Sequence, residues 1–346
     1  MSTASIHPSA IIPLAWPEMT ARGSEKIWIY LRKWKVVKNM NLMVGHAGMV
    51  LVEPDAFRYF DFGRYITPRP MGRPRSAETD PKLFLKTKPA WDALGHLTNF
   101  EALLQELEEK KAATHGDGPM FASILYGVDV QRALVYAQGI QEKGYMGYNG
   151  FNRKQSNCAR FVAQTILASL DSKNPVYRRF RYPITVVPSP YFNVIAGSSS
   201  GRFMMYQNGQ GEWHEKSVGH ALRDILEKGS YAFRRSKAHH LPLDMRAGQL
   251  QEPDERPADI PEEATYLGGI GEGAWHTVYL DGEDQLLMTR IALDGMVEFT
   301  AHYQSTPEIN VAFASRSLTL VHDTHFAWLT LVNSLTQERH RCRRIH

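Results

Sequence analysis

The feature that most constrains the fold is a pair of apolar runs joined by a short turn. Residues 45–65 read GHAGMVLVEPDAFRYFDFGRY, with apolar runs at 46–52 and 57–65 on either side of Glu-Pro-Asp-Ala. Proline followed by aspartate is typical of a turn, and two apolar runs flanking such a turn are typical of paired strands. The stretch therefore predicts an antiparallel β-hairpin.

A second stretch, QSNCARFVAQTILASL at 155–170, predicts a helix with a cysteine at its start. If the helix begins at Asn157 or Cys158, one face carries Cys158, Phe161, Val162, Thr165, Ile166, Ser169 and Leu170. In the first turn, free backbone N–H groups and the positive end of the helix dipole favour a thiolate over a thiol. A catalytic nucleophile is one interpretation of Cys158. The other is a small, buried, inert hydrophobe.

A thiolate nucleophile needs an imidazole nearby, and His46 is the candidate among fourteen histidines. It follows a glycine at the head of an apolar strand, where its side chain can reach across a sheet edge to a helix terminus. A turn centred on Pro54–Asp55 places His46 opposite Gly63, and a register shifted by two places it opposite Asp61. In both registers His46, Asp61 and Tyr59 share one face. A carboxylate at position 61 would be costly to bury unpaired, which favours pairing with His46. The alternative for His46 is a strand-end histidine satisfied by backbone.

The rest of the chain predicts a mixture of helices and strands. We expect a strand at 26–34, a loop at 66–82, helices at 98–111, 129–142 and 218–229, a turn or strand at 144–150, and a hairpin at 201–217. Thr98 and Glu101 have the spacing of a capping box for the first of these helices. Asp-Gly pairs at 281–282 and 294–295, between apolar runs, predict two more hairpins.

These elements predict an α+β protein with a smaller, mostly β region at its C-terminal end. We expect a catalytic domain at 1–195, a connecting hairpin and helix at 196–245, a polar linker or surface loop at 246–264 and a β-rich accessory region at 265–346. A length of 346 residues is ample for this organisation.

Composition and charge narrow the partners. The net charge of +4 is too small to indicate nucleic acid, and no apolar run reaches the roughly 18–20 residues that span a bilayer. The first twenty residues lack the pattern of a secretory signal, so we expect synthesis in the cytoplasm. With only Cys158 and Cys342, far apart in sequence, a disulfide is not expected.

The order of these motifs resembles the circularly permuted papain-like, NlpC-type superfamily. GHAGMVLV is similar to its histidine strand, YFDFGRY occupies the strand of the third residue, and NCARFV resembles its cysteine motif, most closely the Asn-Cys-x-x-Phe-Val form of the lecithin retinol acyltransferase branch. The resemblance covers roughly 26–170 and reaches 195 at most. It implies an antiparallel sheet packed on helices, with Cys158 as nucleophile, His46 as base and Asp61 as the residue that orients the base. Many relatives carry His, Asn or Gln where this chain has Asp61.

The implied chemistry is acyl transfer through a thioester, with the oxyanion held by backbone N–H groups at the helix start. Tyr145, Tyr148, Asn157 and Tyr59 are further candidates for the oxyanion site or the pocket. Three functions fit: an amidase or endopeptidase on a peptide or peptidoglycan-like substrate, a phospholipase or acyltransferase on lipid esters, and a non-enzymatic binding module with an inert Cys158. The resemblance to this superfamily also suggests an effector that is delivered by a specialised secretion system and neutralised by an inhibitory (immunity) protein.

Other motifs give weaker indications of function. HDTH at 322–325 puts two histidines on opposite faces of a strand with no further ligand, so we expect no metal, and we expect no cofactor. GGIGEG at 268–273 lacks the ending of a phosphate loop and is expected to be a turn. Arg69, Arg73, Arg75 and the basic tail 338–346 are candidates for contact with anionic lipid or acidic polymer, or else are solvated surface charge.

Overall fold

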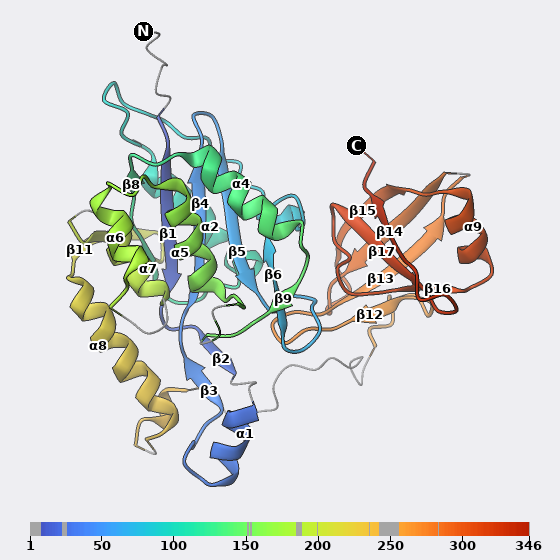
Figure 1. Ribbon diagram of the computed structural model, residues 1–346, viewed down its shortest axis with the longest axis horizontal. Helices are drawn as coiled ribbons and strands as arrows, with labels where there is room; N and C mark the ends of the chain where they lie inside the picture. The colour runs from blue at the N-terminus through green and yellow to red at the C-terminus, as the bar shows by residue number, and fades with distance from the viewer. Residues whose placement is uncertain are drawn as a thin grey trace. The chain divides into compact units, whose positions relative to one another are not determined.

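The computed structural model describes residues 8–22, 26–150, 152, 154–184, 189–198, 200–234, 236–241, 256–282 and 284–345. The chain forms two compact units (Figure 1). The first comprises Met1–Phe62, Leu83–Lys143 and Asn149–Met245, and the second comprises Gly63–Lys82, Gly144–Tyr148 and Arg246–His346. Helices and antiparallel strands alternate in the first unit and strands dominate the second. The prediction of an α+β protein with a β-rich C-terminal region is therefore confirmed.

An antiparallel sheet forms the centre of the first unit. Its strands there are β1 (Ala10–Trp16), β4 (His46–Val52), β5 (Phe57–Gly63), β7 (Met120–Ala122), β10 (Arg202–Gln207) and β11 (Gln210–Glu215), in the order β11-β10-β7-β1-β4-β5, and β8 (Leu125–Tyr126) pairs with β1. The hairpins predicted at 45–65 and 201–217 are confirmed as β4–β5 and β10–β11. The seven buried residues of β1, at the middle of this sheet, escaped the sequence analysis.

Helices cover both faces of this sheet (Figure 1). The helices that follow the β4–β5 hairpin in this unit are α2 (Phe100–Glu109), α3 (Lys111–Thr114), α4 (Val130–Gln141), α5 (Cys158–Ser169), α6 (Pro175–Arg181), α7 (Pro190–Gly197) and α8 (Val218–Gly229). The apolar side of α2 packs with Ile12, Leu14 and Val50, which alternate to one face of the sheet. On the other face α5 and α4 contact β4, and α7 contacts β1. The sheet is thus a middle layer between helices.

Two local expectations for this unit are wrong. Residues 26–34 were expected to form a strand, but Lys26–Lys33 form helix α1. The aromatic and branched residues that favoured a strand there express only a weak preference, which tertiary context overrides. Helix α2 begins after Asn99, and the Thr98 hydroxyl donates to the Ala90 carbonyl 3.0 Å away, so the expected capping box does not form. The remaining short elements are β2 (Thr20–Arg22), β3 (Asn41–Met43), η2 (Ser230–Ala232) and η3 (Ala238–His240).

The second unit contains a four-stranded and a three-stranded antiparallel sheet. Its elements are β6 (Met71–Arg75), β9 (Met146–Gly147), β12 (Thr265–Leu267), β13 (Ala274–Leu280), β14 (Gln285–Ile291), β15 (Val297–Gln304), α9 (Pro307–Ala314), β16 (Leu318–Leu320), β17 (Trp328–Asn333) and β18 (Arg339–Arg343), and η1 (Pro81–Leu83) lies at its boundary. The two hairpins predicted at the Asp-Gly pairs are confirmed as β13–β14 and β14–β15.

The stretch 66–82 is built into the second unit, contrary to the predicted loop. It contains β6, and Arg73 and Arg75 are 3% and 0% exposed, so neither is available to lipid or to solvent as expected. Arg73 forms two hydrogen bonds to the fully buried Asp80, at 2.8 and 2.9 Å. Arg290 of β14 donates to the same carboxylate at 3.0 Å. Arg73 and Arg75, which helped to indicate a loop, instead belong to a buried ion network.

The expected linker 246–264 lies partly outside the described residues, since 242–255 are not described. Its described part, 256–264, packs against β13: Ile260 and Ala264 share a buried cluster with Trp275, and the Arg256 guanidinium lies 4.4 Å from the Trp275 ring centre. In the tail, Arg339 and Arg341 pair with Asp323. No helix in the described ranges is long and apolar enough to cross a bilayer.

Candidate active site

Cys158 is the first residue of α5, as the sequence predicts. The preceding residue, Asn157, has extended backbone (φ −148°, ψ 175°), and its Oδ1 accepts a hydrogen bond from the Arg160 N–H at 2.8 Å. This is an N-cap, which ends the chain's extended run and starts the helix. The Asn157 side chain therefore caps the helix, and its place at the oxyanion site or pocket stays a prediction. Cys158 itself is 6% exposed.

The loop before Cys158 is organised by one guanidinium. Arg160 donates to the carbonyls of Asn149, Gly150, Asn152 and Gln155, at 3.3, 2.6, 2.7 and 2.7 Å. The five N–H donors of arginine form a fixed fork, so a single side chain holds several turns of backbone at once. The shape of the loop that leads to the cysteine consequently depends on a residue only two positions after it.

His46 is the first residue of β4 and is 8% exposed. Gly45 before it has φ +73°, a conformation that favours glycine, and an added Cβ would lie 3.2 Å from both Pro17 and Pro190. The Trp16 ring, directly across the β1–β4 pair, stacks on the imidazole with centroids 5.6 Å apart and planes 20° apart. The backbone before His46 and the ring beside it both restrict where the imidazole can lie.

Asp61 lies beside His46 through the hairpin register. Gly48 pairs with Asp61 in the β4–β5 ladder. The same register places His46 opposite Gly63, so the first of the two predicted registers is confirmed. Asp61 is fully buried, and its Oδ2 lies 3.5 Å from Nε2 of His46. The predicted shared face of the two residues is therefore observed.

Tyr59 contacts the same carboxylate oxygen. Its hydroxyl donates to Oδ2 of Asp61 at 3.1 Å, and the side chain is 2% exposed. A Cβ at residue 48 would lie 2.8 Å from this hydroxyl, so Gly48 leaves the space that Tyr59 crosses to reach Asp61. Tyr59 thus lies against the carboxylate, and its place in the pocket stays a prediction.

The titration of His46 links these groups to Cys158. Burial, the largest influence, lowers the pKa of His46, but hydrogen bonds to Asp61 and Cys158 and the negative charge of both partners outweigh it and raise the pKa from 6.5 to about 9. An imidazole with two anionic neighbours holds its proton more tightly. The arrangement therefore favours an imidazolium between a carboxylate and a sulfur.

The meeting of Cys158 with His46 takes place at the end of the sheet. Phe62 alternates to the face opposite Asp61, and its ring contacts Phe161 of α5 with centroids 5.9 Å apart. Helix α5 thus packs on the face opposite to the one His46 and Asp61 share. Because His46 starts its strand and Cys158 starts its helix, the two side chains meet where both elements begin, as expected for a side chain reaching across a sheet edge.

The two remaining candidates lie in the segment that belongs to the second unit. Tyr145 and Tyr148 are half-buried there, and the Arg64 guanidinium lies 5.1 Å from the Tyr148 ring centre. Trp16 is the neighbour of His46 that sequence reasoning missed. Its signal was the apolar run AIIPLAW at 10–16, but only the long-range pairing of β1 with β4 shows that it ends beside a histidine.

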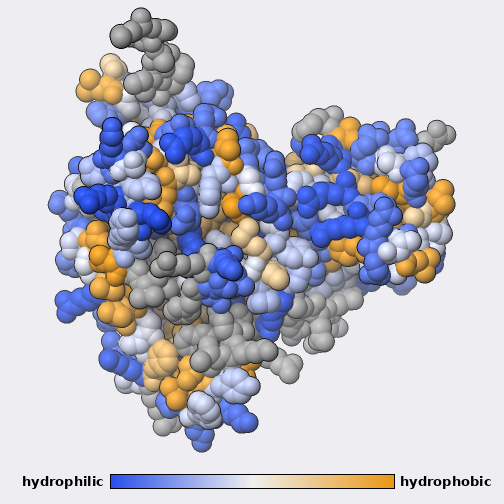
Figure 2. Space-filling view, viewed as in Figure 1, coloured by the Kyte–Doolittle hydropathy of each residue, from blue (hydrophilic) through white to orange (hydrophobic). Residues whose placement is uncertain are grey.

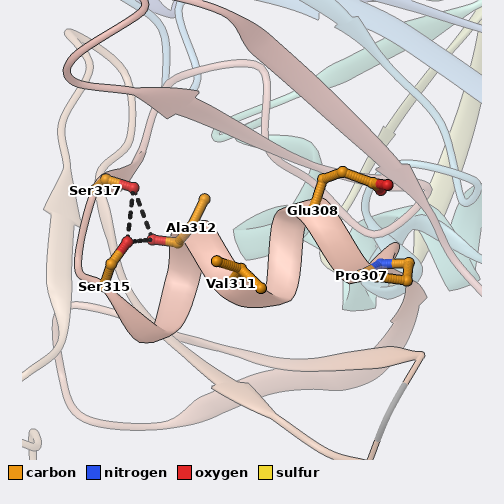
Figure 3. A pocket seen from close by; sticks show the side chains of 6 residues that line it. All are labelled: Pro307, Glu308, Val311, Ala312, Ser315 and Ser317. Carbon is orange, nitrogen blue, oxygen red and sulfur yellow. Dashed lines mark hydrogen bonds between the residues drawn. The ribbon is translucent and has the colours of Figure 1, made fainter.

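Outside this site, the described residues form a shallow cavity but no cluster of metal ligands. In the residues that the structure describes, no cluster of three or more His, Cys, Asp or Glu could hold a metal ion. A shallow cavity of about 570 Å³ lies along α9, lined by Pro307, Glu308, Val311, Ala312, Ser315 and Ser317 (Figure 3). There the hydroxyls of Ser315 and Ser317 donate to the Ala312 carbonyl, at 3.0 and 2.8 Å.

Comparison with known families locates two matches along the chain. Residues 264–338 match the DUF6695 C-terminal domain. No curated protein and no solved structure is significantly similar to the chain. Residues 11–175 match a family described as type VI secretion system effector TseH-like. The part of the chain that carries His46, Asp61 and Cys158 is thus similar to a family of secreted effectors.

Proposed function

We propose that the protein is a cysteine hydrolase that cleaves an amide bond in a peptide or peptidoglycan-like substrate. The observation that carries the proposal is the convergence of three side chains from separate elements: the thiol of Cys158 at a helix start, the imidazole of His46 with its raised pKa, and the buried carboxylate of Asp61. A nucleophile, a base and an orienting group within reach of one another are the parts that thiol acyl transfer needs. In this proposal the first unit is a permuted papain-like domain, with its histidine strand before its cysteine helix.

The reaction has two halves. In the first, the Cys158 thiolate attacks the carbonyl carbon, backbone N–H groups at the start of α5 stabilise the oxyanion, and His46 gives its proton to the leaving nitrogen. In the second, His46 takes a proton from water, the hydroxide attacks the thioester, and the acid leaves as the thiolate re-forms. Asp61 holds the imidazole in place and stabilises its charged form through both halves.

The biological setting follows from the family match. Similarity of residues 11–175 to a type VI effector family supports delivery to another cell by that secretion system and a role as an effector toxin. A cell that makes such a hydrolase needs protection from it, which supports an inhibitory immunity protein as partner. The cell wall is the substrate that fits both the amidase chemistry and delivery to another cell.

The test compares four proteins on two substrates. Wild type, Cys158→Ala, His46→Asn and Cys342→Ala are incubated with purified peptidoglycan and with phospholipid vesicles, and released muropeptides and fatty acids are measured. Cys342 is the matched control because it is the other cysteine, 3% exposed, and burial raises the pKa of its thiol to about 11. We expect muropeptides from wild type and Cys342→Ala only.

Three outcomes contradict the proposal in different ways. Fatty acid in place of muropeptides would make the protein a lipid acyl hydrolase with the same triad, as the form of its cysteine motif first suggested. Full activity of Cys158→Ala would move the nucleophile elsewhere. No product from either substrate would favour the binding module with an inert cysteine.

A further inference from the structure

The first unit carries an exposed surface in which aromatic and apolar side chains alternate with cations. On and after α1, five large apolar side chains are exposed: Ile29 (59%), Tyr30 (57%), Trp34 (70%), Val36 (46%) and Val44 (47%). Between them Arg32, Lys33, Lys35 and Lys38 are also exposed. We call these nine residues the basic–aromatic surface. Figure 2 shows hydrophobic residues beside hydrophilic ones at the lower end of the view, where Figure 1 places α1 and β3.

The charge of this surface has one sign. From Lys26 to Val52 the sequence contains five Lys or Arg residues and no Asp or Glu. The last turn of α1 itself carries Arg32 and Lys33. Within these bounds no acidic residue alternates with the cations, and Glu25 directly precedes them.

A second basic segment extends the surface. The backbone N–H groups of Lys38 and Asn39 donate to the Ala232 carbonyl, at 2.8 and 3.2 Å, which ties the stretch after α1 to η2. Beside Ala232, Phe233 is 38% exposed and Arg234 is exposed. The acidic residue of α8 closest to this segment, Glu227, already pairs with Lys237 at 3.2 Å. In the described residues 26–52 and 218–234, eight Lys or Arg residues accompany two acidic ones, so these two segments together carry a net positive charge.

We propose that the basic–aromatic surface binds the surface of an anionic phospholipid bilayer. Tyrosine and tryptophan rings settle at the headgroup level of a membrane, with the apolar ring inward and the polar edge outward. Lysine and arginine between them meet the lipid phosphates, and each adds attraction that salt screens. Separate apolar side chains divided by cations suit a fluid interface, which adapts to any such array, better than a protein partner, which must match it in shape.

The basic–aromatic surface lies directly before the histidine strand in the sequence, which relates membrane binding to the candidate active site. β3 ends at Met43, three residues before His46, so the surface and the histidine strand are consecutive. If the proposed function also holds, membrane binding would keep the hydrolase at the membrane that adjoins the cell wall. The binding itself does not require the catalytic residues.

The test measures sedimentation of the full chain with vesicles. Vesicles of phosphatidylcholine with about a third phosphatidylglycerol are compared with vesicles of phosphatidylcholine alone, at low salt and at about 0.5 M NaCl. We expect binding to the first only, lost at high salt. Lys33→Glu/Lys35→Glu should weaken it at least about tenfold and Trp34→Ala at least about threefold.

Matched variants separate this surface from charge in general. Lys86→Glu/Lys88→Glu changes two exposed lysines at the same spacing elsewhere in the first unit, and Leu94→Ala removes an apolar side chain that is 81% exposed. Both should bind as wild type does, and so should Cys158→Ala. Absence of binding to anionic vesicles, equal weakening by Lys86→Glu/Lys88→Glu, or binding to an acidic protein in place of vesicles would overturn the proposal. Muropeptide release in solution by Lys33→Glu/Lys35→Glu should equal that of wild type, so loss of membrane binding and loss of hydrolase activity are distinguishable.

Discussion

Two buried aspartates, one in each unit, show what decides whether a buried charge serves chemistry or structure. Asp61 in the first unit and Asp80 in the second are both 0% exposed. Burying a carboxylate is costly in either place unless partners replace the lost water. The two sites differ in those partners.

Asp80 is surrounded by groups that never lose their charge. Burial alone would raise its pKa, but the charges of Arg73 and Arg290, with Arg75 nearby, hold the pKa well below its usual 3.8. Around them Lys82 bridges Glu272 and Glu298, at 2.8 and 2.7 Å. Guanidinium groups remain protonated throughout the accessible pH range, so this network can hold a structure but cannot pass a proton.

Asp61 has partners that can change their state. It faces the imidazole of His46, which itself faces Cys158, and the neutral hydroxyl of Tyr59. A histidine moves its proton at accessible pH, so the same kind of buried carboxylate here adjusts a base. The contrast between the two aspartates therefore predicts different phenotypes. Substitutions around Asp80 should lower the stability of the protein, and substitutions around Asp61 should lower its turnover.

The largest expected effect is on stability, from Arg290→Met. Removing one partner of a buried ion pair leaves the other charge uncompensated, which costs about 3–5 kcal/mol of unfolding free energy. The matched control is Arg58→Met, at a side chain that is 45% exposed and pairs with Glu53; its cost should stay below about 1 kcal/mol. Urea unfolding followed by circular dichroism measures both. Equal costs for the two variants would contradict a structural role for the Asp80 network.

The next effect is on turnover, from Asp61→Asn. The amide keeps the shape of the side chain but removes the charge that orients and stabilises the His46 imidazolium. Turnover on peptidoglycan should fall at least about tenfold, with the unfolding transition largely retained. Asp117→Asn, at a carboxylate whose side chain is 78% exposed, is the control and should leave turnover unchanged. Unchanged turnover in Asp61→Asn would move the orienting role to another residue.

A third difference lies in pH dependence. Because folding raises the pKa of His46 to about 9, its contribution to stability is complete below the unfolded value of 6.5 and is lost as pH rises through about 9. The alkaline limb of kcat/KM should fall in the same window, as the imidazolium loses its proton, and Asp61→Asn should shift that limb to lower pH. The lowered pKa of Asp80 works at the other end, since its contribution is present above 3.8 and is lost as pH falls below it. An alkaline limb that stays in place in Asp61→Asn would separate Asp61 from the imidazole.

The smallest expected effect comes from Tyr59→Phe. Losing one neutral hydrogen bond to Asp61 costs about 0.5–1.5 kcal/mol, so turnover should fall about threefold and the alkaline limb should move slightly. Tyr206→Phe, at a tyrosine that is 3% exposed in the same core cluster, tests whether any buried hydroxyl has this effect. A pH profile that is the same in Tyr59→Phe and wild type would reduce Tyr59 to a packing residue.

The candidate site could be predicted from local sequence because His46 and Cys158 each begin a regular element and the hairpin register places Asp61 beside His46. A turn at Pro54–Asp55 sets the register that places His46 and Asp61 on one face, and an asparagine followed by an apolar stripe starts the helix at Cys158. Each of these signals lies within about twenty residues. Their prediction needs only strand alternation and helix periodicity.

What the sequence could not provide depends on contacts between distant residues. Trp16 reaches His46 only because β1 pairs with β4, and Asp80 meets Arg290 across 210 positions. Arg73 and Arg75 were expected at the surface because charged residues are seldom buried, yet Arg73 pairs with the nearby Asp80 and Arg75 lies 3.9 Å from the distant Glu272. Asp80 itself lies within 66–82, but its burial also depends on Arg290, which the composition of that stretch does not indicate.

The central claim is that His46 activates the sulfur of Cys158. The most direct measurement is the rate of iodoacetamide labelling at pH 6 in the Cys342→Ala background, with and without His46→Asn. If an imidazolium stabilises the thiolate, labelling should be rapid with His46 and at least about tenfold slower without it. Slow labelling at the same rate in both proteins would show a buried, inert thiol and would contradict the account.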